Sequence, residues 1–156
     1  MTNGKLFGLA LLGSASLITT AVIAEPVANG GRKLETTMTG AAECNASGTC
    51  NLGDPDGTGT AKIVVNYGQK RICYELVVSG IATATAAHIH FAPVGVAGAV
   101  VVPLGAPSDG DSSGCVDVSA ELAKNILKNP AAYYVNVHNA DFPSGAIRGQ
   151  LAKQNH

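Results

Sequence analysis

The chain has 156 residues, and its 10 basic side chains against 11 acidic ones give a formal net charge of −1. This length suits a single domain with one core. There is no basic run or patch, which argues against a nucleic-acid partner. Beyond the first two dozen residues, no apolar stretch approaches the length that spans a bilayer.

The N-terminal segment has the order of a secretory signal peptide. A single charge, Lys5, precedes an apolar run over Leu6–Ile23, and Val22 and Ala24 stand three residues and one residue before the expected cut, ahead of Glu25. This order predicts cleavage after Ala24 and export. Losing Lys5 would leave nine basic and eleven acidic residues, a net charge of −2. The mature protein is therefore expected to be secreted or periplasmic, without a membrane contact of its own.

A membrane anchor is the alternative to cleavage. Glycine, serine and threonine interrupt the apolar run, and no basic stop-transfer cluster follows it, so cleavage is favoured. We therefore expect a signal peptide over residues 1–24, an N-terminal leader over 25–33 and one domain over 34–153.

Four cysteines, Cys44, Cys50, Cys73 and Cys115, follow the expected cleavage site. An even number of cysteines in an exported chain predicts disulfides, and four cysteines allow three pairings. Cys44 and Cys50 flank a short polar loop, which favours a local bridge there and leaves Cys73 with Cys115. A four-cysteine zinc site is the rival, and the lack of a Cys-x-x-Cys pair disfavours it.

The chain then reads as short strands separated by turn residues. The expected strands are Leu34–Thr39, Thr60–Asn66, Arg71–Ser79, Thr85–Phe91, Ala99–Leu104, Tyr133–Asn139 and Ala146–Ala152. Several of them alternate apolar and polar residues, the pattern of a half-buried strand. The run Asn66–Gln69 supplies a turn between two of them.

One segment has helical spacing instead. Val118–Asn129 carries apolar residues at helical intervals, with Ser119 as an N-cap and Pro130 as the stop. Strands without intervening helices predict an all-β, antiparallel Greek-key sandwich or barrel, with one short helix before the last two strands. The Asp54-Pro55-Asp56-Gly57 segment could offer carboxylates to calcium, but it lacks the spacing of a calcium loop and is good turn chemistry by itself.

Three histidines lie in expected strands. His88 and His90 are two residues apart, so their side chains share one face at roughly 6–7 Å along the strand. On Tyr133–Asn139 the alternation places Asn136 and His138 together. Two imidazoles at the spacing of His88 and His90 can converge on one ion, with a metal site as one interpretation and ordinary structural histidines as the other.

The last expected strand adds a cation to this face. If the apolar faces of Tyr133–Asn139 and Ala146–Ala152 coincide, Arg148 lies on the same face as Asn136 and His138. His88 and His90 join them if their strand is a neighbour.

Several of these segments resemble one known family. The segments Ala87–Phe91, Tyr133–His138 and Phe142–Leu151, the last reading Phe-Pro-Ser-Gly-Ala-Ile-Arg-Gly-Gln-Leu, resemble the chordin-type (CHRD) domain over about residues 34–152. The resemblance implies an extracellular or periplasmic β-sandwich and implies little about activity. Asn139 departs from the threonine that is usual after the later histidine.

The candidate site is also similar, more weakly, to that of copper,zinc superoxide dismutases. The similarity implies His88 and His90 as a copper-binding pair, His138 as the later ligand and Arg148 as a guide for the superoxide anion. No bridging histidine or zinc loop is present, so any site would hold a single ion. A cupin site lacks its glutamate, and a zinc-activated water as in α-type carbonic anhydrases remains a lesser alternative.

Imidazole ligands alone suit copper, zinc, nickel or iron, and the resemblance implies copper, with zinc as the lesser choice. Two functions stay open. In the first, the metal dismutates superoxide or acts on another small anion, Arg148 raises the rate of encounter, and Asn136 orients a ligand ring. In the second, the domain is a non-catalytic binding or matrix module and the histidines and Arg148 are structural. The sequence does not indicate an oligomeric state.

Overall fold

The computed structural model describes Met1 and residues 31–154, so the expected signal peptide and most of the expected leader lie outside the described residues. Its strands are β1 (Arg32–Thr39), β2 (Thr58–Asn66), β3 (Arg71–Ser79), β4 (Ala84–Phe91), β5 (Ala99–Leu104), β6 (Asp111–Asp117), β7 (Tyr133–Asn139), β8 (Ile147–Gln150) and β9 (Ala152–Lys153). One α-helix, α1 (Ala120–Lys128), and two short 3₁₀ turns, η1 (Gly40–Ala42) and η2 (Pro130–Ala132), complete the described part.

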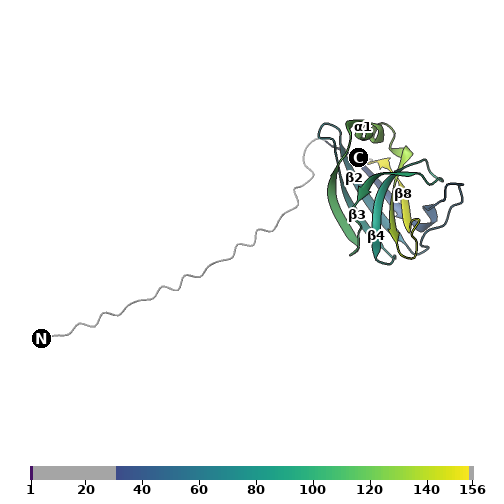
Figure 1. Cartoon of the computed structure of the whole chain (residues 1–156), viewed down its shortest axis with the longest axis horizontal. Coiled ribbons are helices and arrows are strands. Elements are labelled where there is room, and N and C mark those ends of the chain that lie inside the picture. Colours follow the sequence, from purple (N-terminus) through teal and green to yellow (C-terminus); the bar gives the residue numbers. More distant parts are fainter. Residues whose placement is uncertain (2–30, 155–156) are drawn as a thin grey trace.

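The strands form one antiparallel sheet in the order β5-β4-β7-β8-β1-β2-β3-β6, with β9 added to β1. The sheet curls until its two end strands, β5 and β6, approach each other, which makes a nearly closed barrel (Figure 1). The predicted all-β antiparallel fold is confirmed. The order also brings β4 next to β7 and β7 next to β8, the condition on which a shared histidine face depended.

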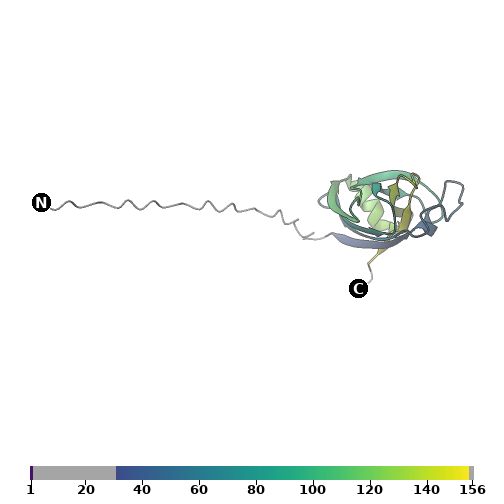
Figure 2. The ribbon, with the colours of Figure 1, turned by 90° about the horizontal axis from the view of Figure 1, so that it is seen from below.

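The core fills the inside of this barrel. Alternate residues of the strands point inward, among them Ile63, Ile72, Ile89 and Val135, each with no exposed surface. The helix α1 contributes Ala123 and Ile126 to the same core, and it lies within the ring of strands when the barrel is viewed end on (Figure 2). Ser119 caps α1 as predicted, because its side chain accepts a hydrogen bond from the Leu122 amide.

Two strand predictions differ from the structure. The strand β6 was not predicted, because its sequence, Asp-Ser-Ser-Gly-Cys-Val-Asp, has little β-propensity. Pairing with β3 over its whole length makes it a strand nevertheless. The expected strand over 146–152 is split at Leu151 into β8 and β9. Within β8, Gly149 lies so close to β1 that a Cβ atom at this position would clash with the Thr37 carbonyl, so only glycine fits there.

Both predicted disulfides are present. Cys44 pairs with Cys50, and Cys73 pairs with Cys115 across the β3–β6 ladder. The Asp54–Gly57 segment is a turn, in which the Asp54 side chain accepts a hydrogen bond from the Asp56 amide. None of the helices in the described residues is long and apolar enough to cross a membrane.

Candidate metal centre

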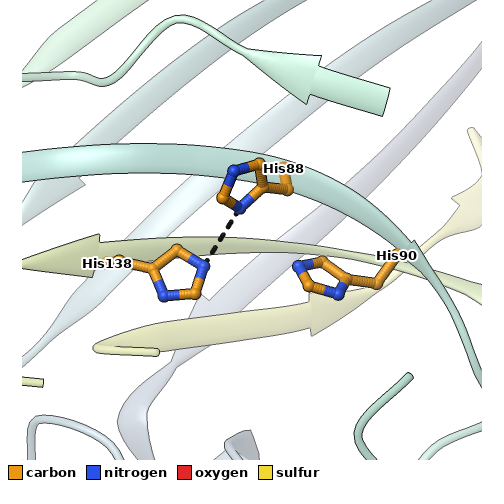
Figure 3. A group of neighbouring side chains, drawn as sticks. All are labelled: His88, His90 and His138. Carbon is orange, nitrogen blue, oxygen red and sulfur yellow. Dashed lines mark hydrogen bonds between the residues drawn. The ribbon is translucent and has the colours of Figure 1, made fainter. Parts of the chain in front are cut away.

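The three strand histidines come together on the outer face of β4 and β7. The pairing of these strands sets His88 opposite Asn136 and His90 opposite Tyr134. One ring nitrogen of each histidine lies within 4.8 Å of the others (Figure 3). Three nitrogens no further apart than this lie within roughly 2.8 Å of a common point. Each nitrogen would therefore have to move by only about 0.7 Å to bind a metal ion at that point, since metal–nitrogen bonds are roughly 2.0–2.1 Å long.

Backbone carbonyls determine which nitrogens face this centre. His138 Nδ1 lies 3.0 Å from the Pro143 oxygen, and His90 Nδ1 lies 2.8 Å from the Gly98 oxygen. A carbonyl only accepts hydrogen bonds, so each Nδ1 carries the proton and each neutral ring keeps its lone pair on Nε2. Histidine ligands in metal sites commonly donate their other N–H in this way.

The two inner Nε2 atoms have different partners. His138 Nε2 lies 3.1 Å from His88 Nδ1, the contact drawn in Figure 3, and without a metal His88 donates in this bond because the His138 nitrogen has no proton. To bind a metal through Nδ1, His88 would carry its proton on Nε2 instead. His90 Nε2 is buried and has no close hydrogen-bond partner among the described residues, although the Asn136 side chain interacts with this ring and raises its pKa. A buried imidazole nitrogen left without a partner is costly, and a metal ion at the centre would satisfy it.

The surroundings favour the neutral form of all three rings. Burial lowers the pKa of His88, His90 and His138, and for His88 and His90 the neighbouring histidines lower it further. Metal ligation requires the unprotonated imidazole. His88 and His138 are only half-buried, so the centre is reachable from solvent, whereas His90 is 7 % exposed.

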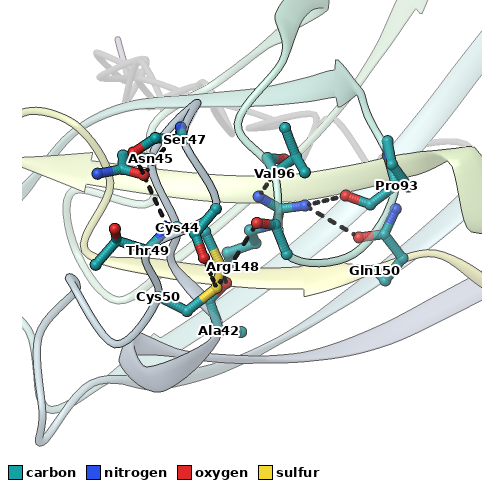
Figure 4. Close-up of a disulfide and its surroundings, with 12 residues drawn as sticks. Ala42, Cys44, Asn45, Ser47, Thr49, Cys50, Pro93, Val96, Arg148 and Gln150 are labelled. Atoms are coloured by element: carbon teal, nitrogen blue, oxygen red, sulfur yellow. Dashed lines mark hydrogen bonds between the residues drawn. A yellow bond between two sulfur atoms is a disulfide. The ribbon is translucent and has the colours of Figure 1, made fainter.

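Arg148 lies on the predicted face but not at the mouth of the centre. Opposite Asn136 in the β7–β8 ladder, it is 1 % exposed and donates to the carbonyls of Pro93 and Val96 at 2.9 and 2.8 Å (Figure 4). Its guanidinium also lies 3.4 Å from the centre of the Tyr134 ring. Arg148 is thus buried with its donors engaged, and its role as a guide for the superoxide anion stays a prediction.

Arg148 also holds the β4–β5 loop beside the candidate centre. Gln150 donates to the Ala92 carbonyl, and the Gly98 amide donates to the Tyr134 hydroxyl, so both ends of the β4–β5 loop are tied down. The Tyr134 ring stacks on His90 at 4.7 Å with an angle of 11°. The same loop provides the Gly98 oxygen that sets the His90 tautomer, so Arg148 acts on the centre through the loop and through Tyr134.

Sequence patterns do not point to one further residue of this region, Glu43. It follows η1, its neighbour Cys44 forms the disulfide shown in Figure 4, and it is 4 % exposed. Burial raises the pKa of its carboxyl from 4.5 to about 7, although Arg148 and a hydrogen bond from Asn136 lower it. It stands in an irregular loop without periodicity, and only the packing of that loop on β7 and β8 brings it here.

Glu43→Gln is expected to change the pH dependence of stability. The unfolded chain releases the Glu43 proton near pH 4.5 and the folded chain near pH 7, so this group lowers the free energy of unfolding as pH rises between these values. Above pH 7 the free energy of unfolding is therefore about 3 kcal/mol lower than it would be if the Glu43 pKa stayed at 4.5 in the folded chain. The variant should therefore gain stability over the wild type at pH 8 and lose that gain near pH 4.5, measured by urea unfolding at both values. An equal difference at both pH values would contradict the raised pKa.

Comparison with known proteins finds one family. The CHRD domain model matches residues 34–151. Neither a curated protein nor a solved structure matches the chain. Because the match spans nearly all of the described residues and includes the three histidines and Arg148, this chain belongs to the CHRD domain family.

Proposed function

We propose that this CHRD-domain protein is exported and binds one copper ion through His88, His90 and His138. One observation carries the proposal: backbone carbonyls take the outer N–H of His90 and of His138, which leaves both Nε2 atoms facing a common centre beside His88 Nδ1. A purely structural cluster would not need a buried His90 Nε2 without a partner.

Copper is the metal proposed for this site. Imidazole ligands suit copper, zinc, nickel and iron, and affinity among divalent ions is highest for copper. Zinc is the second choice. The two disulfides and the CHRD domain are consistent with an extracellular protein, and export to the periplasm or the medium, directed by residues 1–24, is part of the proposal. Mass spectrometry of the purified protein, with Glu25 as the expected first residue, tests it.

Superoxide dismutation is the finer candidate activity. The half-buried positions of His88 and His138 leave one side of the centre open to a small ligand. One superoxide would lose its electron to Cu(II) as dioxygen, and a second would take it back with two protons as hydrogen peroxide. Arg148 is 1 % exposed and its donors are engaged, so it would act on the anion through its charge and not through a direct hydrogen bond.

Metal loading tests the site. Protein produced with its own N-terminal segment should take up one copper per chain. His88→Ala/His138→Ala should weaken copper binding by more than about 100-fold, since two of three ligands are lost. Tyr67→Ala, which removes an exposed ring from the β2–β3 turn, is the control and should bind copper as the wild type does.

The same variants separate the alternative function. In a non-catalytic binding or matrix module with structural histidines, the double variant would melt at a lower temperature without metal and copper would stabilise neither protein. In a metal-binding protein, added copper should raise the melting temperature of the wild type alone. Equal copper uptake by wild type and double variant would refute the three-histidine site.

A further inference from the structure

Asn136 lies closer to the metal centre than an orienting residue needs to be. It stands in the middle of β7, pairs with His88 on one side and Arg148 on the other, and is 2 % exposed. Its Oδ1 is 3.0 Å from His138 Nε2, the nitrogen that faces the centre. The outer nitrogen of His138, which an orienting residue would hold, is already bonded to the Pro143 carbonyl.

This contact places two electron-pair donors side by side. Because His138 Nδ1 carries the ring proton, Nε2 has only a lone pair to offer. An amide oxygen is likewise an acceptor, so the pair at 3.0 Å is not a hydrogen bond between neutral groups. A cation that accepts electron pairs from both atoms would turn the contact into a favourable one.

Reversing the amide, so that Nδ2 donates to His138, would also remove the conflict. The structure itself directs Oδ1, not Nδ2, to His138. Glu43 supports that orientation, because the Asn136 side chain lowers the pKa of its buried carboxyl, the effect expected when an amide N–H faces a carboxylate. To the ionised carboxylate only the Nδ2 group can donate, which leaves Oδ1 directed to His138. Glu43 is itself 4 % exposed, so solvent does not replace this interaction.

We propose that Asn136 Oδ1 is the fourth ligand of the metal ion and that Glu43 is the positioning residue that aims it. This rests on the three-histidine site proposed above. Two ligands of one ion, each roughly 2.1 Å from it, lie about 3.0 Å apart at a right angle and about 3.4 Å apart in a tetrahedron. The distances from His138 Nε2, 3.0 Å to Asn136 Oδ1 and 3.1 Å to His88 Nδ1, are of this size.

An oxygen ligand changes which ions the site prefers. Three imidazoles accept both copper oxidation states, whereas an amide oxygen is a harder donor that favours divalent ions. The site is therefore selective for Cu(II) or Zn²⁺ over Cu(I), and loss of the oxygen shifts its preference toward Cu(I).

The experiment compares Asn136→Ala with the exchanged pair Glu43→Gln/Asn136→Asp in the full chain. The exchange keeps an oxygen directed at the histidines, while the amide introduced at position 43 now donates the hydrogen bond that Asn136 donated. Glu43→Gln alone is the background for the exchange. Each protein is titrated with Cu(II), and the loaded form is recorded by electron paramagnetic resonance; melting without metal checks that each variant folds.

Asn136→Ala should bind Cu(II) about ten-fold more weakly and show altered copper hyperfine splitting, and its affinity for Cu(I) should fall less. The exchanged pair should bind Cu(II) at least as tightly as the wild type. The fourth ligand would be overturned, with the histidine site left in place, by either of two results. One is an Asn136→Ala variant whose Cu(II) affinity and spectrum match the wild type. The other is an exchanged pair that loses as much Cu(II) affinity as Asn136→Ala does. Absence of copper uptake by the wild type would overturn that site, and this inference with it.

Discussion

Arg148→Ala is expected to lower the free energy of unfolding by about 3–5 kcal/mol, a large part of the stability of a domain of this size. The guanidinium is 1 % exposed and donates to Pro93, Val96 and the Gln150 side chain. Alanine would leave these acceptors without donors and would open a cavity beside Tyr134. Urea unfolding followed by circular dichroism measures the loss.

The variant should also weaken metal binding without removing any ligand. The β4–β5 loop that Arg148 holds carries the Gly98 oxygen bonded to His90 Nδ1. Release of this loop would free the His90 ring to turn. Copper affinity should therefore fall together with stability, which an exposed anion guide would not require.

Two comparison variants sharpen the test. Arg71→Ala removes a half-exposed arginine whose partner is Asp117, and its unfolding midpoint should stay within error of the wild type. Arg148→Lys keeps the charge but cannot reach both carbonyls with a planar fork, so it should lie between wild type and alanine. If Arg148→Ala proved as stable as Arg71→Ala, the buried hydrogen bonds of Arg148 would contribute little to the free energy of unfolding.

Removal of the Cys73–Cys115 disulfide is expected to cost about 4 kcal/mol. The two cysteines are 42 residues apart, and a bridge over a loop of that length restricts the unfolded chain by about this amount in the chain-entropy account. The bridge also ties the edge strand β6, which has weak β-propensity, to β3. Cys73→Ser/Cys115→Ser should therefore unfold at much lower urea concentration.

The second disulfide is the matched comparison. Cys44 and Cys50 are only 6 residues apart, so Cys44→Ser/Cys50→Ser should cost about 2 kcal/mol by the same reasoning. A larger loss from the short bridge than from the long one would contradict chain entropy as the main term. It would point instead to the packing of the 44–50 loop against the β4–β5 loop, where the Ala97 amide donates to the Asn45 carbonyl.

The strands could be predicted because their information is local. Alternation in Arg71–Ser79 and Tyr133–Asn139 assigns each side chain to a face, and both strands have the predicted bounds. The turn at Asn66–Gln69 and the cap at Ser119 depend on neighbouring residues only. By contrast, β6 lacks alternating apolar residues, and only its pairing with β3 and the Cys73–Cys115 bridge make it a strand.

The candidate site could be predicted in part. Two histidines two residues apart on a strand must share a face, and matching of apolar faces placed Arg148 on the face of Asn136, as the pairing of these two residues shows. The loops over these residues could not be predicted, since their conformation depends on contacts distant in sequence. Those loops bury Arg148, and they supply the Gly98 and Pro143 carbonyls and the Glu43 carboxyl.

The antiparallel β fold, a preference among the cysteine pairings and the side chains that share a strand face thus follow from the amino-acid sequence. They rest on the two-residue period of a strand and on short loops. Three features emerge only in the folded chain: the position of β4 beside β7, the burial of Arg148, and the contact of Asn136 Oδ1 with His138. Convergence of side chains from separate strands is a property of the whole sheet and its covering loops, which local periodicity does not encode.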